Sequence, residues 1–106
     1  MQFPKELCNR TITIYRPRGG TVDRYVTKGF YHYMDVWLTE RFRREFLLVL
    51  PEELQLQAGD RIYDGIGPET VDWDKFLPVR YPGLSQIGKV REHRFQGTFY
   101  YMEASH

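Results

Sequence analysis

The chain has 106 residues, which fits one domain, and 15 Lys and Arg against 14 Asp and Glu give a formal net charge of +1. This length leaves little room for an elaborate catalytic cleft, and the charge balance excludes strong attraction of the whole protein to nucleic acid or anionic membrane. The single cysteine, Cys8, excludes an internal disulfide and a cysteine-based zinc site, and no apolar run reaches the roughly 20 residues that span a bilayer. Residues 1–10 lack the apolar centre of a signal peptide. We therefore expect one soluble β-rich domain over residues 1–106, made in a cytoplasm.

Aromatic residues make up 16% of the chain, and such residues favour strands and contact surfaces. In RTITIYR, residues 10–16, two isoleucines alternate with threonine and tyrosine, which is typical of a half-buried strand. The sequence PRGG at residues 17–20 ends this strand, because proline cannot donate to a ladder and glycine accepts turn geometry.

A second extended stretch is predicted over residues 22–38, with a bulge or bend at Gly29. Both of its faces are largely apolar. The strand is therefore expected to be covered on two sides or exposed to a partner.

Residues 39–50, TERFRREFLLVL, allow two predictions. Two Glu–Arg pairs four residues apart would support a helix over residues 35–48. The β-rich flanks and the apolar ending before Pro51 instead suit a buried strand that follows a turn at residues 39–41. We expect the hairpin, with the helix as the alternative.

The stretch AGDRIYDGIG, residues 58–67, combines two aspartates with three glycines. Its spacing does not match an EF-hand loop, and its aspartates would repel a bound phosphate. It is predicted to be a short strand with Ile62 in the core. The turns on either side are made by Gly59, Asp60, Asp64 and Gly65.

An irregular excursion is expected over about residues 68–86, with one helical turn capped by Asp72. Residues 87–96 and 98–104 then form two further strands. Together these elements predict a mainly β fold, a small five- to six-stranded barrel or sandwich with one short helical turn and the irregular excursion.

Residues that carry chemistry are sparse. The three histidines lack the spacing of zinc ligands, no nucleophile, phosphate or dinucleotide motif occurs, and no base is identified beside Cys8. We therefore expect no enzymatic activity, no metal site and no cofactor. A distant alternative is a cation site in a loose cluster of carboxylates, made up of Asp60, Asp64, Glu69, Asp72 and Asp74.

Basic residues interleave with aromatic residues along the expected strands, as in OB folds that hold single-stranded nucleic acid. The basic residues are Arg16, Arg18, Arg24, Lys28, Arg41, Arg43, Arg44, Lys89, Arg91 and Arg94. Because acidic residues balance them, solvated strand faces are the simpler interpretation. A small OB-like single-stranded nucleic-acid-binding protein is the alternative function.

Three segments occur in a characteristic order: TITIYRPRGGTVDRYVTKGFYHY, AGDRIYDGIG and DWDKFLPVRYPGLSQIGKVREHRFQGTFYYMEAS. They combine a threonine-rich strand, an aromatic strand, a glycine-aspartate turn, a PGL step and a final hairpin that ends in an acidic-alanine pair. In this order they resemble a family of small minor structural proteins of tailed phages and prophages of Gram-positive bacteria. Residues 34–50 depart from the family pattern, because LTERFRREF brings charges where a polar, glycine-containing loop is expected.

The resemblance implies a head–tail connector or minor capsid protein, assembled into the virion in the cytoplasm of the bacterial host. The implied partners are portal, adaptor or tail components and other copies in a homo-oligomeric ring, without a membrane or a small-molecule substrate. The family has no catalytic residues, so the resemblance assigns none to this chain. It implies that residues 59–65 form a structural turn.

Contact surfaces are expected because eight Tyr, seven Phe and two Trp exceed what a small barrel core readily absorbs. The predicted contact residues are Trp73, Phe76, Leu77 and Tyr81 of the excursion, together with Tyr31, Tyr33 and Trp37. The alternative for the excursion is that it folds back to cap one end of the barrel. Arg41, Arg43 and Arg44 are predicted to line a lumen through which DNA passes without base recognition.

Overall fold

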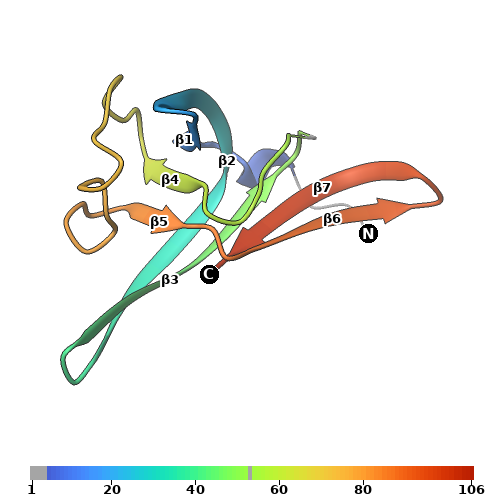
Figure 1. The fold of residues 1–106 in the computed structure, drawn as a ribbon. Coiled ribbons are helices and arrows are strands. Elements are labelled where there is room, and N and C mark those ends of the chain that lie inside the picture. The colour runs from blue at the N-terminus through green and yellow to red at the C-terminus, as the bar shows by residue number, and fades with distance from the viewer. Residues whose placement is uncertain (1–4, 53) are drawn as a thin grey trace.

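The computed structural model describes residues 5–52 and 54–106, so residues 1–4 of the segment considered as a signal peptide lie outside it. Seven strands form one antiparallel sheet in the order β5-β4-β1-β2-β3-β7-β6 (Figure 1). The elements in chain order are η1 (Lys5–Leu7), β1 (Arg10–Arg18), β2 (Thr21–Leu38), β3 (Arg41–Leu50), β4 (Arg61–Asp64), β5 (Leu84–Gln86), β6 (Lys89–Phe95) and β7 (Thr98–Ser105). The predicted mainly β class is confirmed.

The sheet is open and has β5 and β6 at its edges, whereas a barrel or sandwich of five or six strands was expected. The additional strand is β5, which lies inside the segment expected to be irregular. Its three residues pair with β4, about twenty residues earlier in the chain. This strand therefore depends on its pairing partner and not on an alternating pattern of apolar and polar residues. The predicted helical turn is a hydrogen-bonded turn, in which Asp72 C=O accepts from the Lys75 and Phe76 N–H groups, both at 2.9 Å.

The long strand β2 changes its pairing partner at Gly29, the predicted position of the bend. Residues 21–29 pair with β1 and residues 30–38 pair with β3, and Figure 1 shows β2 curving from one half of the sheet into the other. A Cβ atom at Gly29 would lie 2.7 Å from Leu50 Cδ2 and 2.8 Å from Val49 O. Glycine therefore lets β3 approach β2 closely where the two halves of the sheet meet.

Residues 35–48 form a hairpin and not a helix, with a turn at Thr39 and Glu40. Asp35 and Arg44 are directly opposite in the ladder, and Arg44 Nε lies 2.6 Å from Asp35 Oδ1. A cross-strand ion pair thus takes the place of the helical pairs that the sequence allowed.

The main core lies between the two halves of the curved sheet. Ile62 is fully buried there, as predicted for AGDRIYDGIG. The buried members of the main core are Ile12, Ile14, Tyr31, Phe46, Leu48, Leu50, Ile62, Ile87, Met102 and Ala104.

A second, smaller core lies on the opposite face of β1. Tyr15, Phe76 and Leu84 form it, and the Tyr15 and Phe76 rings meet edge to face at 4.8 Å. Thr13 and Tyr15 are consequently as buried as the isoleucines of β1. The prediction of a half-buried strand is wrong, because the segment between β4 and β5 folds back over this face.

Candidate interaction surfaces

The distal part of the β2–β3 hairpin is a two-stranded ribbon that projects from the rest of the sheet (Figure 1). Strand β3 pairs with β7 over residues 47–50, whereas residues 41–46 pair with β2. Three apolar side chains near the end of the ribbon are more than half exposed: Met34 at 57%, Trp37 at 64% and Leu38 at 55%. We call these three residues the ribbon tip. Met34 and Leu38 lie on one face of β2 and Trp37 on the other, so both faces of the ribbon carry exposed apolar side chains, as is typical of contact sites.

The three aromatic residues predicted as contacts on β2 have different surroundings. Trp37 lies at the ribbon tip, with its ring 5.0 Å from that of Phe42. Tyr33 is half-buried, and its hydroxyl donates to Asp64 Oδ2 at 3.3 Å. Tyr31 is buried in the main core, so its assignment as a contact residue is corrected.

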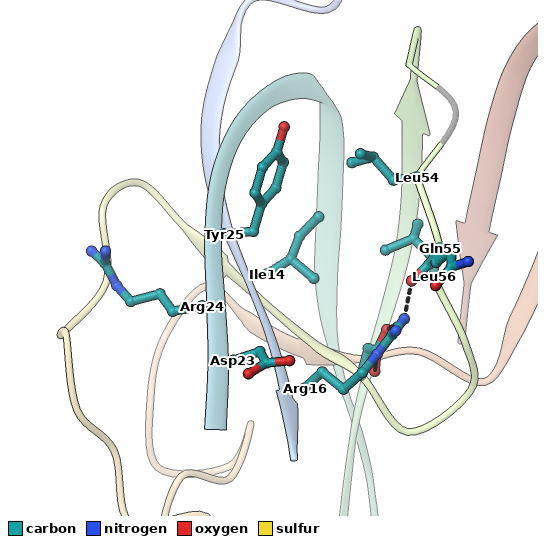
Figure 2. A pocket seen from close by; sticks show the side chains of 9 residues that line it. Ile14, Arg16, Asp23, Arg24, Tyr25, Leu54, Gln55 and Leu56 are labelled. Atoms are coloured by element: carbon teal, nitrogen blue, oxygen red, sulfur yellow. Dashed lines mark hydrogen bonds and ion pairs between the residues drawn. The ribbon is translucent and has the colours of Figure 1, made fainter. Parts of the chain in front are cut away.

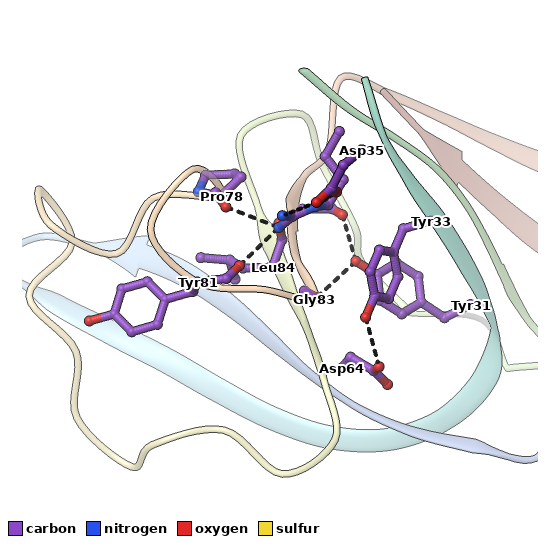
Figure 3. Close-up of polar contacts among 10 residues, drawn as sticks. Tyr31, Tyr33, Asp35, Asp64, Pro78, Tyr81, Gly83 and Leu84 are labelled. Carbon is purple, nitrogen blue, oxygen red and sulfur yellow. Dashed lines mark hydrogen bonds and ion pairs between the residues drawn. The ribbon is translucent and has the colours of Figure 1, made fainter. Parts of the chain in front are cut away.

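The hydroxyl of Tyr31 lies among polar groups of the segment that leads into β5. It donates to Gly83 O at 3.0 Å and lies 2.5 Å from Ser85 Oγ (Figure 3). Burial raises the pKa of Tyr31 above its ordinary value. The side chain of Tyr31 therefore meets the core and not a partner.

The excursion folds back, as in the alternative prediction, but it covers one face of β1 in an open sheet and not the end of a barrel. Phe76 is only 1% exposed in the second core, so its predicted role as a contact residue is corrected. Trp73 and Leu77 are half-buried, and Tyr81 is 37% exposed with its ring 5.1 Å from Phe76. The aromatic residues of the excursion therefore pack mainly against their own chain.

A buried arginine, Arg44, ties the excursion to the β2–β3 hairpin. Its Nη1 donates to the carbonyl oxygens of Pro78 at 3.0 Å, Tyr81 at 2.9 Å and Leu84 at 2.5 Å (Figure 3). Its Nε pairs with Asp35, and the bond to this side chain holds the pKa of Asp35 below its ordinary value. Arg44 is 7% exposed and fully engaged, so the prediction that it lines a lumen for the passage of DNA is wrong.

The other two arginines predicted for a lumen, Arg41 and Arg43, are exposed. Arg43 Nη2 lies 2.7 Å from Glu45 Oε1, so part of its charge is balanced locally. A DNA-facing role for these two residues stays a prediction.

A second buried arginine, Arg61, holds the excursion from the β4 side. Its Nη1 donates to Trp73 O at 2.6 Å and Phe76 O at 2.7 Å, and its guanidinium lies 3.8 Å from the centre of the Trp73 ring. Burial lowers the pKa of Arg61 from its ordinary value. Sequence reasoning missed this residue, because nothing in AGDRIYDGIG distinguishes a buried arginine from an exposed one.

The turns of AGDRIYDGIG have the expected glycine geometry, with φ of +95° at Gly59 and +94° at Gly65. Asp60 is 1% exposed, pairs with Arg16 at 2.8 Å and accepts the Gln57 N–H at 3.0 Å. These bonds occupy the carboxylate of Asp60, which therefore stabilises the turn.

Asp64 closes the other end of β4. It receives two bonds from Arg10, Nε to Oδ1 at 2.7 Å and Nη2 to Oδ2 at 2.8 Å. Both aspartates of the motif are therefore engaged by arginines of β1.

A cleft of about 290 Å³ opens beside the Arg16 and Asp60 pair (Figure 2). Its walls include Ile14, Tyr25 and Leu56. Arg16 also donates to Gln55 O. The other two charged residues of the wall bond outside the cleft, Asp23 to Arg18 and Arg24 to the carbonyl oxygens of Gly67 and Pro68. Each charged side chain of the wall thus already has a partner within the chain.

Groups that could support chemistry are few in the described ranges 5–52 and 54–106. These ranges contain no cluster of three His, Cys, Asp or Glu side chains that could hold a metal ion. Cys8 is buried, and burial raises the pKa of its thiol. No helix within these ranges is long and apolar enough to cross a membrane.

Comparison with known proteins gives no relative, because no family model, curated protein or solved structure matches this chain.

Proposed function

We propose that this protein is a non-enzymatic structural component of a phage or prophage virion, a head–tail connector or minor capsid component that acts through protein–protein assembly. The structural observation that carries the assembly role is the exposed ribbon tip of Met34, Trp37 and Leu38. The order of the three sequence segments supports the assignment to tailed phages.

The ribbon is well suited to present an anchor to a partner. Tryptophan is among the residues that most often dominate binding energy when buried at an interface. The ladder between β2 and β3 and the bonds of Arg44 to Asp35 and the excursion fix the base of the ribbon. A tip held on a fixed base loses less conformational entropy on binding than a flexible loop does.

The experiment is to complement a phage or prophage that lacks this gene with wild type or with the double variant Trp37→Ala, Leu38→Ala. We expect the wild-type chain in purified particles and the double variant absent from them, with at least about a tenfold loss of infectious particles, since tenfold corresponds to about 1.4 kcal/mol of lost binding. The matched control is Phe95→Ala, because Phe95 is 59% exposed at the other ribbon, formed by β6 and β7. Wild-type particles that lack the chain, or normal incorporation of the double variant, would contradict the proposal.

Single-stranded nucleic-acid binding is the second candidate. The edge strand β6 exposes Lys89, Arg91 and Arg94, beside a His93 ring stacked at 4.1 Å on Tyr101. Glu92 lies 2.8 Å from Arg94, which reduces the net charge of this strand. Tight binding of a single-stranded oligonucleotide that weakens steeply with salt would favour this candidate over the structural role.

A further inference from the structure

The edge strand β6 has an open side to which another strand can add. Within residues 5–52 and 54–106, β6 pairs with β7 and no strand pairs with its outer side, and Figure 1 shows it along the outside of the sheet. The other edge strand, β5, has three residues, whereas β6 has seven. The backbone N–H and C=O groups on the open side of an edge strand can form a ladder with an added strand. The chemistry of this edge therefore specifies an extended polypeptide as its partner.

The regular part of this edge is residues 89–93, KVREH. The register of the β6–β7 ladder shifts between His93 and Arg94, which marks a bulge. A bulge bends its strand and interrupts the ladder. An added strand therefore meets residues 89–93, and Phe95 near the end of the hairpin lies outside this contact.

The two faces of residues 89–93 differ, because successive side chains of a strand point to opposite faces. On one face Val90 lies opposite Ala104 and Glu92 lies opposite Met102, and both of these β7 residues are buried in the main core. Val90 itself packs against this core. Apolar side chains of an added strand would lie beside Val90 and extend the cover of the core.

The other face is basic. Lys89 and Arg91 are exposed there and take part in none of the ion pairs that the described residues form with one another. Glu103 lies opposite Arg91 in the ladder, but its carboxylate lies 3.3 Å from His93 Nε2. A hollow of about 490 Å³ is lined in part by Lys89 and Arg91. This face thus carries two cations against one carboxylate and has room for acidic side chains of a partner.

The charges of β6 oppose pairing of this strand with a second copy of itself. Pairing about a two-fold axis brings each residue opposite one that points to the same face. An axis at Val90 puts Lys89 opposite Arg91. An axis at Arg91 or at Glu92 puts that residue opposite its own copy, and like charges directly opposite one another destabilise a ladder. The same two cations favour a strand that carries carboxylates.

We propose that the partner of β6 is an extended protein segment with carboxylates at alternate positions, which adds to residues 89–93 with its acidic side chains beside Lys89 and Arg91. A strand of nucleic acid would match the charge of this edge, but it cannot continue a ladder of N–H and C=O groups. The inference goes beyond the proposed function, because β6 is separate from the ribbon tip.

The probe is the peptide acetyl-TEVEVET-amide with a fluorescent label, titrated with the full chain at low salt and followed by fluorescence anisotropy. We expect saturable binding with a dissociation constant of about 1 mM or below, which weakens as salt is added. Amide hydrogen exchange in residues 89–93, measured by mass spectrometry, should slow when the peptide binds, because the open backbone groups become paired.

Two control peptides separate strand addition from charge alone. Acetyl-TVEEEVT-amide has the same composition without the alternation. The probe N-methylated at its third and fourth residues keeps the charges but lacks one backbone N–H on each side of the strand. Each control should bind at least about fivefold more weakly than the probe.

The protein variant is Lys89→Gln, Arg91→Gln, which removes both cations without placing a new carboxylate beside Glu103. It should bind the probe at least about fivefold more weakly than wild type. The matched control is Lys28→Gln, Arg41→Gln, which removes the same charge from exposed positions outside β6 and should bind like wild type. Circular dichroism melts check that both variants keep the fold.

Three results would each overturn the inference: no binding of the probe up to about 1 mM, equal binding of either control peptide, or unchanged binding by the β6 variant. Tighter binding of an oligothymidylate of about 16 nucleotides than of the probe would overturn it in favour of the nucleic-acid candidate. The virion experiment above is separate, since it tests the ribbon tip and the peptides test β6.

Discussion

At the scale of single residues, Thr13 has an influence that its size would not suggest. Its buried hydroxyl serves Gly65 O and Gly67 N–H together. Thr13→Val keeps the β-branched shape but leaves the partly buried Gly65 carbonyl and the buried Gly67 N–H without this partner, which costs about 1–3 kcal/mol. We expect the free energy of unfolding in urea to fall by about 2 kcal/mol.

Thr11→Val is the control for this substitution, because Thr11 lies on the same strand and is only half-buried. A loss of stability of equal size in both variants would show that the two bonds of Thr13 are not its cause.

Tyr31 makes the protein sensitive to alkaline pH. Burial raises its pKa in the folded state, so the unfolded chain releases this proton at lower pH than the folded chain does. The contribution of Tyr31 is therefore complete below about pH 10, the ordinary tyrosine pKa, and is lost as pH rises through the folded-state pKa.

We expect the unfolding free energy of wild type to fall more steeply than that of Tyr31→Phe between about pH 9 and about pH 11. Burial also raises the pKa values of Tyr15 and Tyr33, but these residues are common to both proteins, and so the difference isolates Tyr31. Parallel curves from urea titrations would contradict this prediction.

At the scale of the elements, the approach of β3 to β2 depends on Gly29. An added methyl group there would overlap Leu50 Cδ2 and Val49 O. Overpacking of this kind costs about 1–3 kcal/mol, so Gly29→Ala should lower the melting temperature measured by circular dichroism. Lys28→Ala, at the neighbouring exposed position, should change the melting temperature little, and a Gly29→Ala protein as stable as this control would refute the argument.

The regular elements follow from local patterns that the sequence displays. Alternation in RTITIYR predicted β1, and the break between the predicted strands 87–96 and 98–104 coincides with the turn between β6 and β7, where Gly97 has a φ of +81°. Strand β5 was not predicted, because three residues are too few to show an alternating pattern of apolar and polar side chains. They are extended because they pair with β4.

The candidate surfaces were harder to predict than the strands. Aromatic content suggested contact residues, but it cannot say which ring meets the core, so Trp37 is exposed while Tyr31 and Phe76 are buried. The burial of Arg44 was not predicted, because its carbonyl partners lie more than thirty residues away along the sequence. Burial that arises from distant pairing leaves no local pattern to detect.

At the scale of the whole molecule, Arg44 joins the β2–β3 hairpin to the excursion. Arg44→Met would leave the buried carbonyl of Leu84 and the partly buried carbonyls of Pro78 and Tyr81 without this donor. The carboxylate left behind, Asp35, lies at the surface, so the cost comes from the lost hydrogen bonds of a charged donor, which are worth about 1.5–3 kcal/mol. We expect a loss of stability in this range and faster amide hydrogen exchange across residues 72–84 by mass spectrometry.

Arg43→Met is the control, because Arg43 is exposed and its pair with Glu45 lies at the surface. Such a change should alter stability by less than about 0.5 kcal/mol. Unchanged exchange in the Arg44→Met excursion would show that this arginine does not hold it.

The shared strand β2 also governs how the chain gains and loses its structure. One half of β2 completes the ladder with β1 and the other half completes the ladder with β3, so neither side of the sheet can come apart without disturbing a strand that the other side needs. Pairings such as Ile12 with Asp64 also join residues far apart in the chain. Such non-local topologies fold slowly, over milliseconds to seconds. The two sides of the sheet are thus thermodynamically coupled, and the chain gains its cooperativity from the strand that bends at Gly29.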